Sequence, residues 1–123
     1  MEMEFKELTE KIIGAAIEVH RRLGPGFIES IYERALIIEL EKRRLSVQAQ
    51  FPVVIEYDAI EVGKHRLDLI VEETIVVELK TVKELADIHY AIVKSYLRAS
   101  KRRHGLLLNF AKTTLEVKRV IDR

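Results

Sequence analysis

The stretch RLDLIVEETIVVELK, residues 66–80, decides the fold of this chain. It holds two apolar runs, 66–71 and 75–80, on either side of the polar segment 72–74. A connection this short between two strand-like runs predicts an antiparallel hairpin. Each run nevertheless carries charge where a buried strand should carry none, and the residues concerned are Asp68, Glu78 and Lys80.

Side-chain alternation assigns these charges to faces of the hairpin. Asp68 shares a face with Arg66 and Ile70, and Glu78 shares a face with Lys80. Adjacent antiparallel strands can bring Asp68 beside Glu78, where like charges repel unless a cation lies between them. A divalent metal ion with oxygen ligands is the obvious candidate. The alternative is a solvent-exposed face on which Arg66 and Lys80 pair with the carboxylates, but the apolar neighbours favour cover on both faces.

Two helices are predicted upstream of this stretch. Apolar residues at helical spacing predict a helix over 5–23, which the turn Gly24-Pro25-Gly26 ends, and a second helix over about 28–43. Glu29 and Glu33 share one side of the second helix, next to the glycine turn. They fit either acids favoured by the helix dipole or acids that contribute to a site.

The pattern changes after the second helix and becomes strand-rich. It predicts, in order, a strand over 47–57, a turn region over 58–63, strands over 64–71 and 75–80, a helix over 83–100, and strands over 106–110 and 113–121. Gly105 is expected to cap the third helix. The predicted order is α-α-β-β-β-α-β-β, in a single domain over residues 1–123.

Length and composition limit the class of protein. The chain has 123 residues, of which 48% are hydrophobic and 33% charged, as in one globular domain. No run approaches the ~20 apolar residues of a membrane span, and residues 1–4 lack the basic and apolar regions of a signal peptide. The absence of cysteine excludes disulfides and thiolate metal sites, and it fits a cytoplasmic location. The net charge of +1 means that nucleic-acid binding would need a local patch.

Two motifs resemble those of a known family. Gly26-Phe27-Ile28-Glu29-Ser30-Ile31-Tyr32 resembles the signature of the GxxExxY protein family. Asp68 followed by Glu78-Leu79-Lys80 resembles the Asp…(Asp/Glu)-x-Lys core of the PD-(D/E)XK nuclease superfamily, to which that family is assigned. The resemblance covers about residues 8–109. It implies an α/β fold with a mixed sheet flanked by helices, and hydrolysis of nucleic-acid phosphodiesters with Mg²⁺ or Mn²⁺.

The resemblance also implies a role for each matching residue of the core motif. Asp68 and Glu78 would bind the metal ion, and the backbone carbonyl of Leu79 would supply a further ligand. Lys80 would position or activate the attacking water and stabilise charge on the phosphate. These roles agree with the chemistry, because phosphodiester hydrolysis needs a nucleophilic water and a stabilised phosphate.

The helices would add auxiliary groups. Glu29 would hold metal-bound water, with Glu33 as the alternative for that role, and Tyr32 and Tyr96 are possible auxiliary residues. Relatives often carry a Gln four residues before a tyrosine like Tyr96, and here Ile92 occupies that position. This departure concerns catalytic efficiency and leaves the metal ligands intact. Tyr96 fits equally well as a core residue.

Other polar residues give weaker signals. Lys101, Arg102 and Arg103 could contact phosphates, or they could form a solvated helix end that offsets the helix dipole. The histidines show no metal-ligand spacing and are expected to be structural or exposed; they are His20, His65, His89 and His104.

The sequence therefore predicts a metal-dependent nuclease acting on DNA or RNA, with DNA favoured as the partner and no membrane. The alternative is a module that keeps the nuclease fold, is catalytically weak or inactive, and binds nucleic acid or another protein. A third reading treats the carboxylates as surface ion pairs only. A homodimer stays open, because no interface signature is visible.

Overall fold

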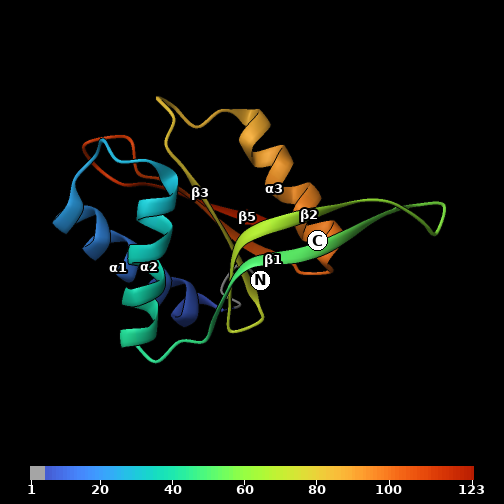
Figure 1. Cartoon of the computed structure of the whole chain (residues 1–123), viewed down its shortest axis with the longest axis horizontal. Helices are drawn as coiled ribbons and strands as arrows, with labels where there is room; N and C mark the ends of the chain where they lie inside the picture. Colours follow the sequence, from blue (N-terminus) through green and yellow to red (C-terminus); the bar gives the residue numbers. More distant parts are fainter. Residues whose placement is uncertain (1–4) are drawn as a thin grey trace.

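Five strands form one mixed sheet with helices on both faces (Figure 1). The computed structural model describes residues 5–123, so the acidic residues 1–4 lie outside the described part. The elements are α1 Lys6–Leu23, α2 Glu29–Lys42, β1 Val47–Tyr57, β2 Ile60–Val71, β3 Ile75–Lys80, α3 Asp87–Ser100, β4 His104–Asn109 and β5 Glu116–Ile121. The predicted order α-α-β-β-β-α-β-β is confirmed. Over the described residues, no helix combines the length and apolar character needed to cross a membrane.

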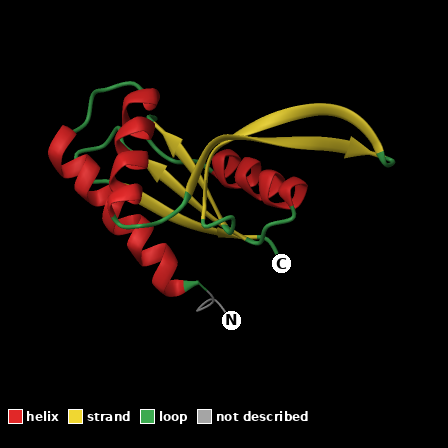
Figure 2. Cartoon of the chain, turned by 60° about the horizontal axis from the view of Figure 1, so that its bottom comes forward, coloured by secondary structure: helices red, strands yellow, loops and turns green. Residues whose placement is uncertain are grey.

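The strands lie in the sheet in their chain order, β1 to β5. Neighbours pair antiparallel except β3 and β4, which are parallel and are connected through α3. Helices α1 and α2 pack on one face and α3 on the other (Figure 2). Cover on both faces buries β3 and β4 completely or nearly so, which explains why their sequences are mostly apolar.

The glycine turn between α1 and α2 has the geometry that the sequence predicts. Gly24 and Gly26 have φ angles of 72° and 113°, a region in which residues with a Cβ are disfavoured. The N–H of Gly24 donates to the carbonyl of His20 at 2.8 Å and so closes the last turn of α1. The turn delivers the chain directly to Glu29, the first residue of α2.

The β1–β2 hairpin is longer than predicted. The expected turn region 58–63 is wrong, because the strands pair as far as Tyr57 and Ile60 and only Asp58 and Ala59 form the turn. Both turn residues have positive φ, 54° and 63°, as two-residue hairpin turns require. Neither is glycine, so the usual sequence signal for such a turn is absent. The end of the hairpin projects from the body of the molecule (Figure 2).

The boundaries around α3 also differ from the prediction. The helix begins at Asp87 rather than at residue 83 and ends at Ser100 as predicted, and the residue that caps it is Lys101, which adopts φ 60°. Gly105 is not a cap but lies inside β4. A Cβ on Gly105 would lie 3.3 Å from both the carbonyl of Val76 and a methyl of Val93, so glycine allows α3 to pack closely on the sheet.

Candidate functional site

The candidate site lies where β2 and β3 separate. The strands pair from Leu69–Val77 toward the turn, and the ladder does not extend to Asp68 and Glu78. The N–H of Asp68 donates to Glu78 Oε2 at 2.9 Å, and the N–H of Leu79 donates to Asp68 Oδ2 at 2.9 Å. Two carboxylates thus take the place of backbone carbonyls as acceptors. The expected proximity of Asp68 and Glu78 is confirmed.

Strand β1, which pairs with β2 on the side away from β3, is irregular at the position opposite Asp68. Gln50 of β1 has φ 54°, and no pairing joins it to Asp68 although the flanking residues pair in register. The predicted alternation also fails next to this point. Leu67 packs with Ile70 under α3, whereas alternation places it with Leu69 on the opposite face. The irregularity therefore coincides with the residue that carries the first carboxylate.

Burial changes the acidity of both carboxyl groups, and repulsion by Asp68 adds to the change at Glu78. Glu78 is 5% exposed, and burial together with the charge of Asp68 raises the pKa of Glu78 to about 8, against the opposing effects of the Asp68 N–H and Lys80. Burial also raises the pKa of Asp68, against the N–H of Leu79 and the charges of Lys80 and His65. The pair is therefore poorly compensated near neutral pH, and a cation placed between the carboxylates would relieve the repulsion.

The alternative of an exposed sheet face with simple ion pairs is wrong. Glu78 is buried, and in the part of the chain that the structure describes neither Arg66 nor Lys80 forms an ion pair within 4.0 Å with Asp68 or Glu78. Lys80 is half-buried at the end of β3. Its charge lowers the pKa of both carboxyl groups, so it lies within electrostatic reach of them. Its ammonium group is therefore left available at the edge of the site.

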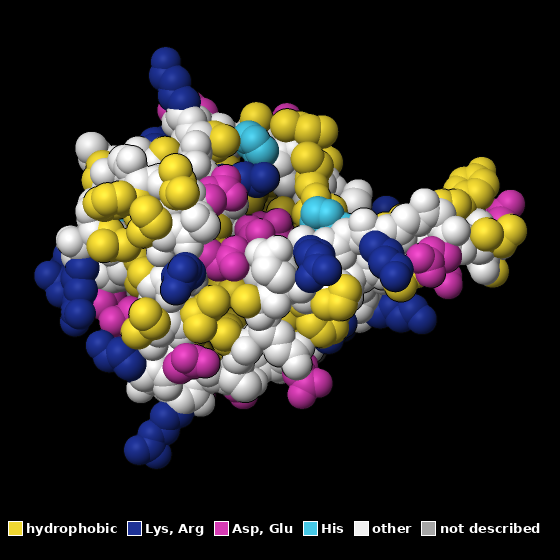
Figure 3. Space-filling model, in the orientation of Figure 1, with side chains coloured by type: hydrophobic (Ala, Val, Ile, Leu, Met, Phe, Trp, Pro, Cys, Tyr) yellow, Lys and Arg dark blue, Asp and Glu magenta, His cyan; other side chains and the backbone are white. Residues whose placement is uncertain are grey.

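Two acids of α2 face the same region. Glu29 is exposed, and its charge contributes to the raised pKa values of Glu33 and Glu78. Glu33 is half-buried, and Gln50 Nε2 donates to both of its carboxylate oxygens at 3.2 Å. Burial is the main cause that raises the pKa of Glu33, followed by the charges of Asp68 and Glu29. The space-filling view shows acidic side chains gathered in a hollow between the α1–α2 layer and α3 (Figure 3).

Tyr32 supports α2 from inside the fold. Its side chain is fully buried, and its hydroxyl donates to the carbonyl of Gly24 at 2.6 Å and accepts from the N–H of Phe27 at 3.1 Å. Its ring stacks on Phe110 with a centroid distance of 4.6 Å. Tyr32 therefore holds the glycine turn that positions Glu29 and is not itself accessible at the site.

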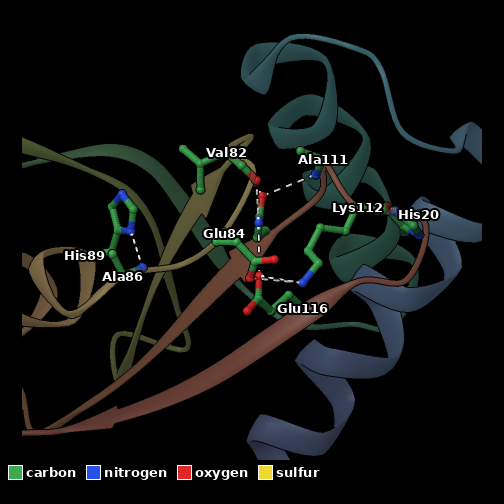
Figure 4. Close-up of polar contacts among 9 residues, drawn as sticks. His20, Val82, Glu84, Ala86, His89, Ala111, Lys112 and Glu116 are labelled. Atoms are coloured by element: carbon green, nitrogen blue, oxygen red, sulfur yellow. Dashed lines mark hydrogen bonds and ion pairs between the residues drawn. The ribbon is translucent and has the colours of Figure 1, made fainter.

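A polar cluster anchors the loop that follows Lys80. Asn109, the ladder partner of Lys80, is fully buried, and its side chain accepts from the N–H of Val82 at 3.0 Å and donates to the carbonyl of Val82 at 2.8 Å. Figure 4 shows this loop tied to the β4–β5 connection, where Lys112 reaches Glu84 at 3.4 Å. These contacts restrain the backbone directly after the lysine.

His65 makes a contact beside the site that the sequence pattern does not predict. His65 of β2 stacks on Tyr96 of α3, with ring centroids 3.9 Å apart and an interplanar angle of 22°. Tyr96 is half-buried, and burial followed by the charges of Glu78 and Asp68 raises its pKa. Tyr96 thus lies beside the site and not wholly in the core. His65 was expected to be merely structural or exposed, and only its place three residues before Asp68 could have suggested more.

Two of the other histidines have structural roles, as expected. His89 Nδ1 accepts from the N–H of Ala86 at 2.8 Å and so caps the start of α3 (Figure 4). His20 Nε2 lies 2.8 Å from the carbonyl of Lys112 and links α1 to the β4–β5 connection.

The basic cluster 101–103 is not part of this hollow. It precedes β4, whose first residue pairs with Ile75, whereas Glu78 lies three residues further along β3, about 10 Å away. Arg102 is engaged in the fold, since its guanidinium donates to the carbonyls of Glu73 and Ser100 at 3.2 and 2.9 Å and lies over the ring of Phe51. The structure therefore separates the predicted phosphate contacts from the carboxylates.

The donor set fits a hard divalent cation that keeps most of its water ligands. Among residues 5–123, no group of three or more His, Asp or Glu side chains lies close enough to form a complete metal cage. Mg²⁺ is commonly bound through one or two carboxylates and several waters, and Mn²⁺ also prefers oxygen ligands. Asp68 Oδ1 and Glu78 Oε1, the oxygens outside the two backbone hydrogen bonds, could serve as those ligands.

Comparison with known proteins gives one match. A family model described as the PD-(D/E)XK nuclease superfamily matches residues 6–120, which include every helix and all but the last residue of the sheet. Neither the curated proteins nor the solved structures contain a significant match. The finer GxxExxY assignment stays a prediction.

Proposed function

The chain belongs to the PD-(D/E)XK nuclease superfamily, and we propose that it is a metal-dependent nuclease that hydrolyses phosphodiester bonds of DNA or RNA. The observation that carries this proposal is the Asp68–Glu78 pair, two carboxylates that backbone N–H groups hold next to each other. Lys80 lies two residues after Glu78 in β3. A buried carboxylate pair with a purely structural role is expected to form an ion pair with a cationic side chain. Among the described residues, no cationic side chain forms an ion pair with Asp68 or Glu78 within 4.0 Å.

Asp68 and Glu78, with the backbone carbonyl of Leu79, would hold Mg²⁺ or Mn²⁺. When bound, such an ion lowers the pKa of the attacking water and offsets charge on the phosphate. The residues of the chain supply the rest. Lys80, which has no ion-pair partner within residues 5–123, would orient the water and stabilise the phosphate oxygens through its ammonium group.

Glu29 is the stronger candidate for the acid that holds a water in the site. It is exposed and has no hydrogen bond or ion pair within the described residues, so its carboxylate can accept from a water. Glu33 has both oxygens engaged by Gln50. We assign Glu33 a supporting role beside Asp68, whose charge helps to raise the pKa of Glu33.

The substrate is proposed to be nucleic acid, with DNA favoured over RNA. The net charge of +1 provides no general attraction, so affinity would come from local cations. The cluster 101–103 lies about 10 Å from the carboxylates, which is comparable to the rise of about three base pairs along the axis of a duplex. Lys101 and Arg103 would therefore contact phosphates that flank the cleaved bond, while Arg102 braces the cluster.

A second candidate is a nuclease-fold module that binds nucleic acid without cutting it. Ile92 favours this function, because it stands one turn before Tyr96 where relatives often carry a Gln, and its side chain offers no hydrogen bond. The location in the cytoplasm and the formation of a homodimer stay predictions, and sedimentation of the purified chain would test the second of these.

Cleavage of end-labelled DNA and RNA, single- and double-stranded, in Mg²⁺ or Mn²⁺ tests the proposal. We expect cleavage that EDTA stops and that Lys80→Ala abolishes. Lys94→Ala is the matched control, since it removes an exposed lysine from α3 and should leave cleavage unchanged. Salt-sensitive binding without cleavage by the wild type would support the binding module and overturn the nuclease.

A further inference from the structure

The stack of His65 on Tyr96 joins the two elements that border the site. His65 lies on β2, three residues before Asp68, and Tyr96 lies on α3, which covers that face of the sheet. The rings are nearly parallel, at 22°, with centroids 3.9 Å apart. A stacked contact of this kind restricts the orientation of both rings.

The polar atoms of this stack are unused. His65 Nε2 is buried and has no hydrogen-bond partner. Within residues 5–123, it is the one buried side-chain nitrogen or oxygen atom in this condition. An unpaired buried group costs roughly 1–3 kcal/mol, so its retention calls for an explanation. Because Nε2 is buried, this nitrogen is not presented to a ligand. Besides its charge, which lowers the pKa of Asp68, the imidazole can contribute through the face of its ring.

The hydroxyl of Tyr96 is also without a partner in the described part of the chain. Two other tyrosines form hydrogen bonds through their hydroxyl groups. Tyr32 donates to the carbonyl of Gly24, and Tyr90 donates to the carbonyl of Arg119 at 3.3 Å. Burial and the nearby carboxylates raise the pKa of Tyr96, so the phenol keeps its proton at neutral pH and remains a donor. Ile92, one turn earlier on α3, has no donor to offer.

We propose that His65 is a positioning residue that holds the ring of Tyr96, so that the Tyr96 hydroxyl donates a hydrogen bond to a non-bridging oxygen of the bound phosphodiester. The inference rests on the proposed function, because it assumes a phosphodiester beside Asp68 and Glu78. It assigns to this site a histidine that the superfamily motif does not include. The flat face of the His65 ring supports the tyrosine.

A double-mutant cycle tests whether His65 acts through Tyr96. The variants are Tyr96→Phe, His65→Ala and the two combined, and the measurement is binding of a labelled DNA duplex in Ca²⁺ by fluorescence anisotropy, with kcat and KM for cleavage in Mn²⁺. A lost hydrogen bond to a charged oxygen should weaken binding roughly 10-fold. We expect each single variant to lose about that factor and the double variant to bind no more weakly than Tyr96→Phe.

Two further variants separate the stack from general effects on the fold. His65→Phe keeps a flat ring without nitrogen atoms and should restore binding to within about 2-fold of the wild type. Tyr90→Phe is the matched control, because it removes a hydroxyl from the same helix that is already bonded to Arg119. It should leave binding unchanged. Thermal unfolding of every variant confirms that the folded fraction is equal at the assay temperature.

The outcomes distinguish this inference from the proposed function. If the wild type binds and cuts nucleic acid but His65→Ala weakens binding equally in the wild-type and Tyr96→Phe backgrounds, His65 does not act through Tyr96 and the inference is overturned. Failure of His65→Phe to restore binding overturns it as well. If the wild type neither binds nor cuts any nucleic acid, the proposed function fails, and the inference fails with it.

Discussion

The carboxylate of Glu78 accepts a hydrogen bond from the N–H of Asp68, and the carboxylate of Asp68 accepts one from the N–H of Leu79, both at 2.9 Å. Each side chain is therefore held by the backbone of the opposite strand. The two acids are placed before any ligand binds, and this arrangement lowers the cost of organising a metal site. Because the two bonds share one pair of strands, a substitution at either acid will disturb the other.

The stability of the metal-free protein should fall as the pH rises from about 5 to about 8. Burial and the charges of Asp68 and Glu29 raise the pKa of Glu78 from its ordinary 4.5 to about 8, with Lys80 opposing. The folded state therefore binds more protons than the unfolded state in this window, and stability is lost as Glu78 ionises. Urea unfolding at several pH values in EDTA would measure this.

Glu78→Gln is the control for that pH dependence. The amide keeps an oxygen acceptor for the N–H of Asp68 but cannot ionise. We expect the variant to be more stable than the wild type at pH 8 and to show a flatter profile. A wild-type profile that is level from pH 5 to pH 8 would show that Glu78 titrates at an ordinary pKa.

Binding of Mn²⁺ should release protons. Near pH 7 a carboxyl with a pKa of about 8 is mostly protonated, and a metal ligand must lose its proton. We expect calorimetric titrations in two buffers of different ionisation enthalpy to report release of about one proton per ion bound. Asp68→Asn should abolish the isotherm, whereas Asp87→Asn, in the exposed first turn of α3, should not. An isotherm that survives Asp68→Asn would place the metal elsewhere.

Glu29 should matter more than Glu33 for cleavage. The free carboxylate of Glu29 can hold a water, and loss of a group that acts in proton transfer or water positioning commonly costs on the order of 10²-fold or more. Glu33→Gln keeps a polar side chain beside Gln50 and should cost roughly 10-fold or less. Initial rates at saturating Mn²⁺ for Glu29→Gln and Glu33→Gln decide between them, and the reverse ranking would make Glu33 the acid in contact with water.

Local sequence signals were sufficient for the fold order and for the meeting of the carboxylates. Alternation placed Asp68 and Glu78 on facing positions, and the glycine turn ended α1 where it was expected to end. The hairpin turn at Asp58 and Ala59 was missed, since positive φ without glycine leaves no mark in the composition. The predicted cap at Gly105 is wrong, because glycine is needed there for close packing against α3 and not for a local turn.

The parts of the site that depend on contacts between distant elements could not be predicted. The stack of His65 on Tyr96 joins residues 31 positions apart by their numbers, and the hydrogen bond of Gln50 to Glu33 depends on a left-handed residue inside a strand. No periodicity encodes either contact. The separation of the cluster 101–103 from the carboxylates was likewise invisible, because it follows from the parallel register of β3 and β4.

Asn109 connects the fold to the site. Its buried amide accepts from the N–H groups of Val82 and Ala111 and donates to the Val82 carbonyl and to Glu116. Asn109→Ala would leave several of these groups unpaired, each at a cost of roughly 1–3 kcal/mol where water cannot reach them. We expect a loss of about 2–4 kcal/mol in the free energy of unfolding, measured as a lower urea midpoint with an unchanged slope.

Loss of Asn109 should also impair cleavage in molecules that remain folded. The side chain restrains the loop directly after Lys80, whose own carbonyl accepts from the N–H of Phe110 at 2.9 Å, so its removal should let the lysine ammonium move away from the phosphate. In low urea, the rate per folded molecule should fall by roughly 10-fold, since small misplacement of a catalytic group is costly. Gln48→Ala, which removes an exposed amide from β1, controls for amide loss and should change neither quantity. A variant that is less stable but cuts at the normal rate per folded molecule would show that Asn109 supports the fold without positioning Lys80.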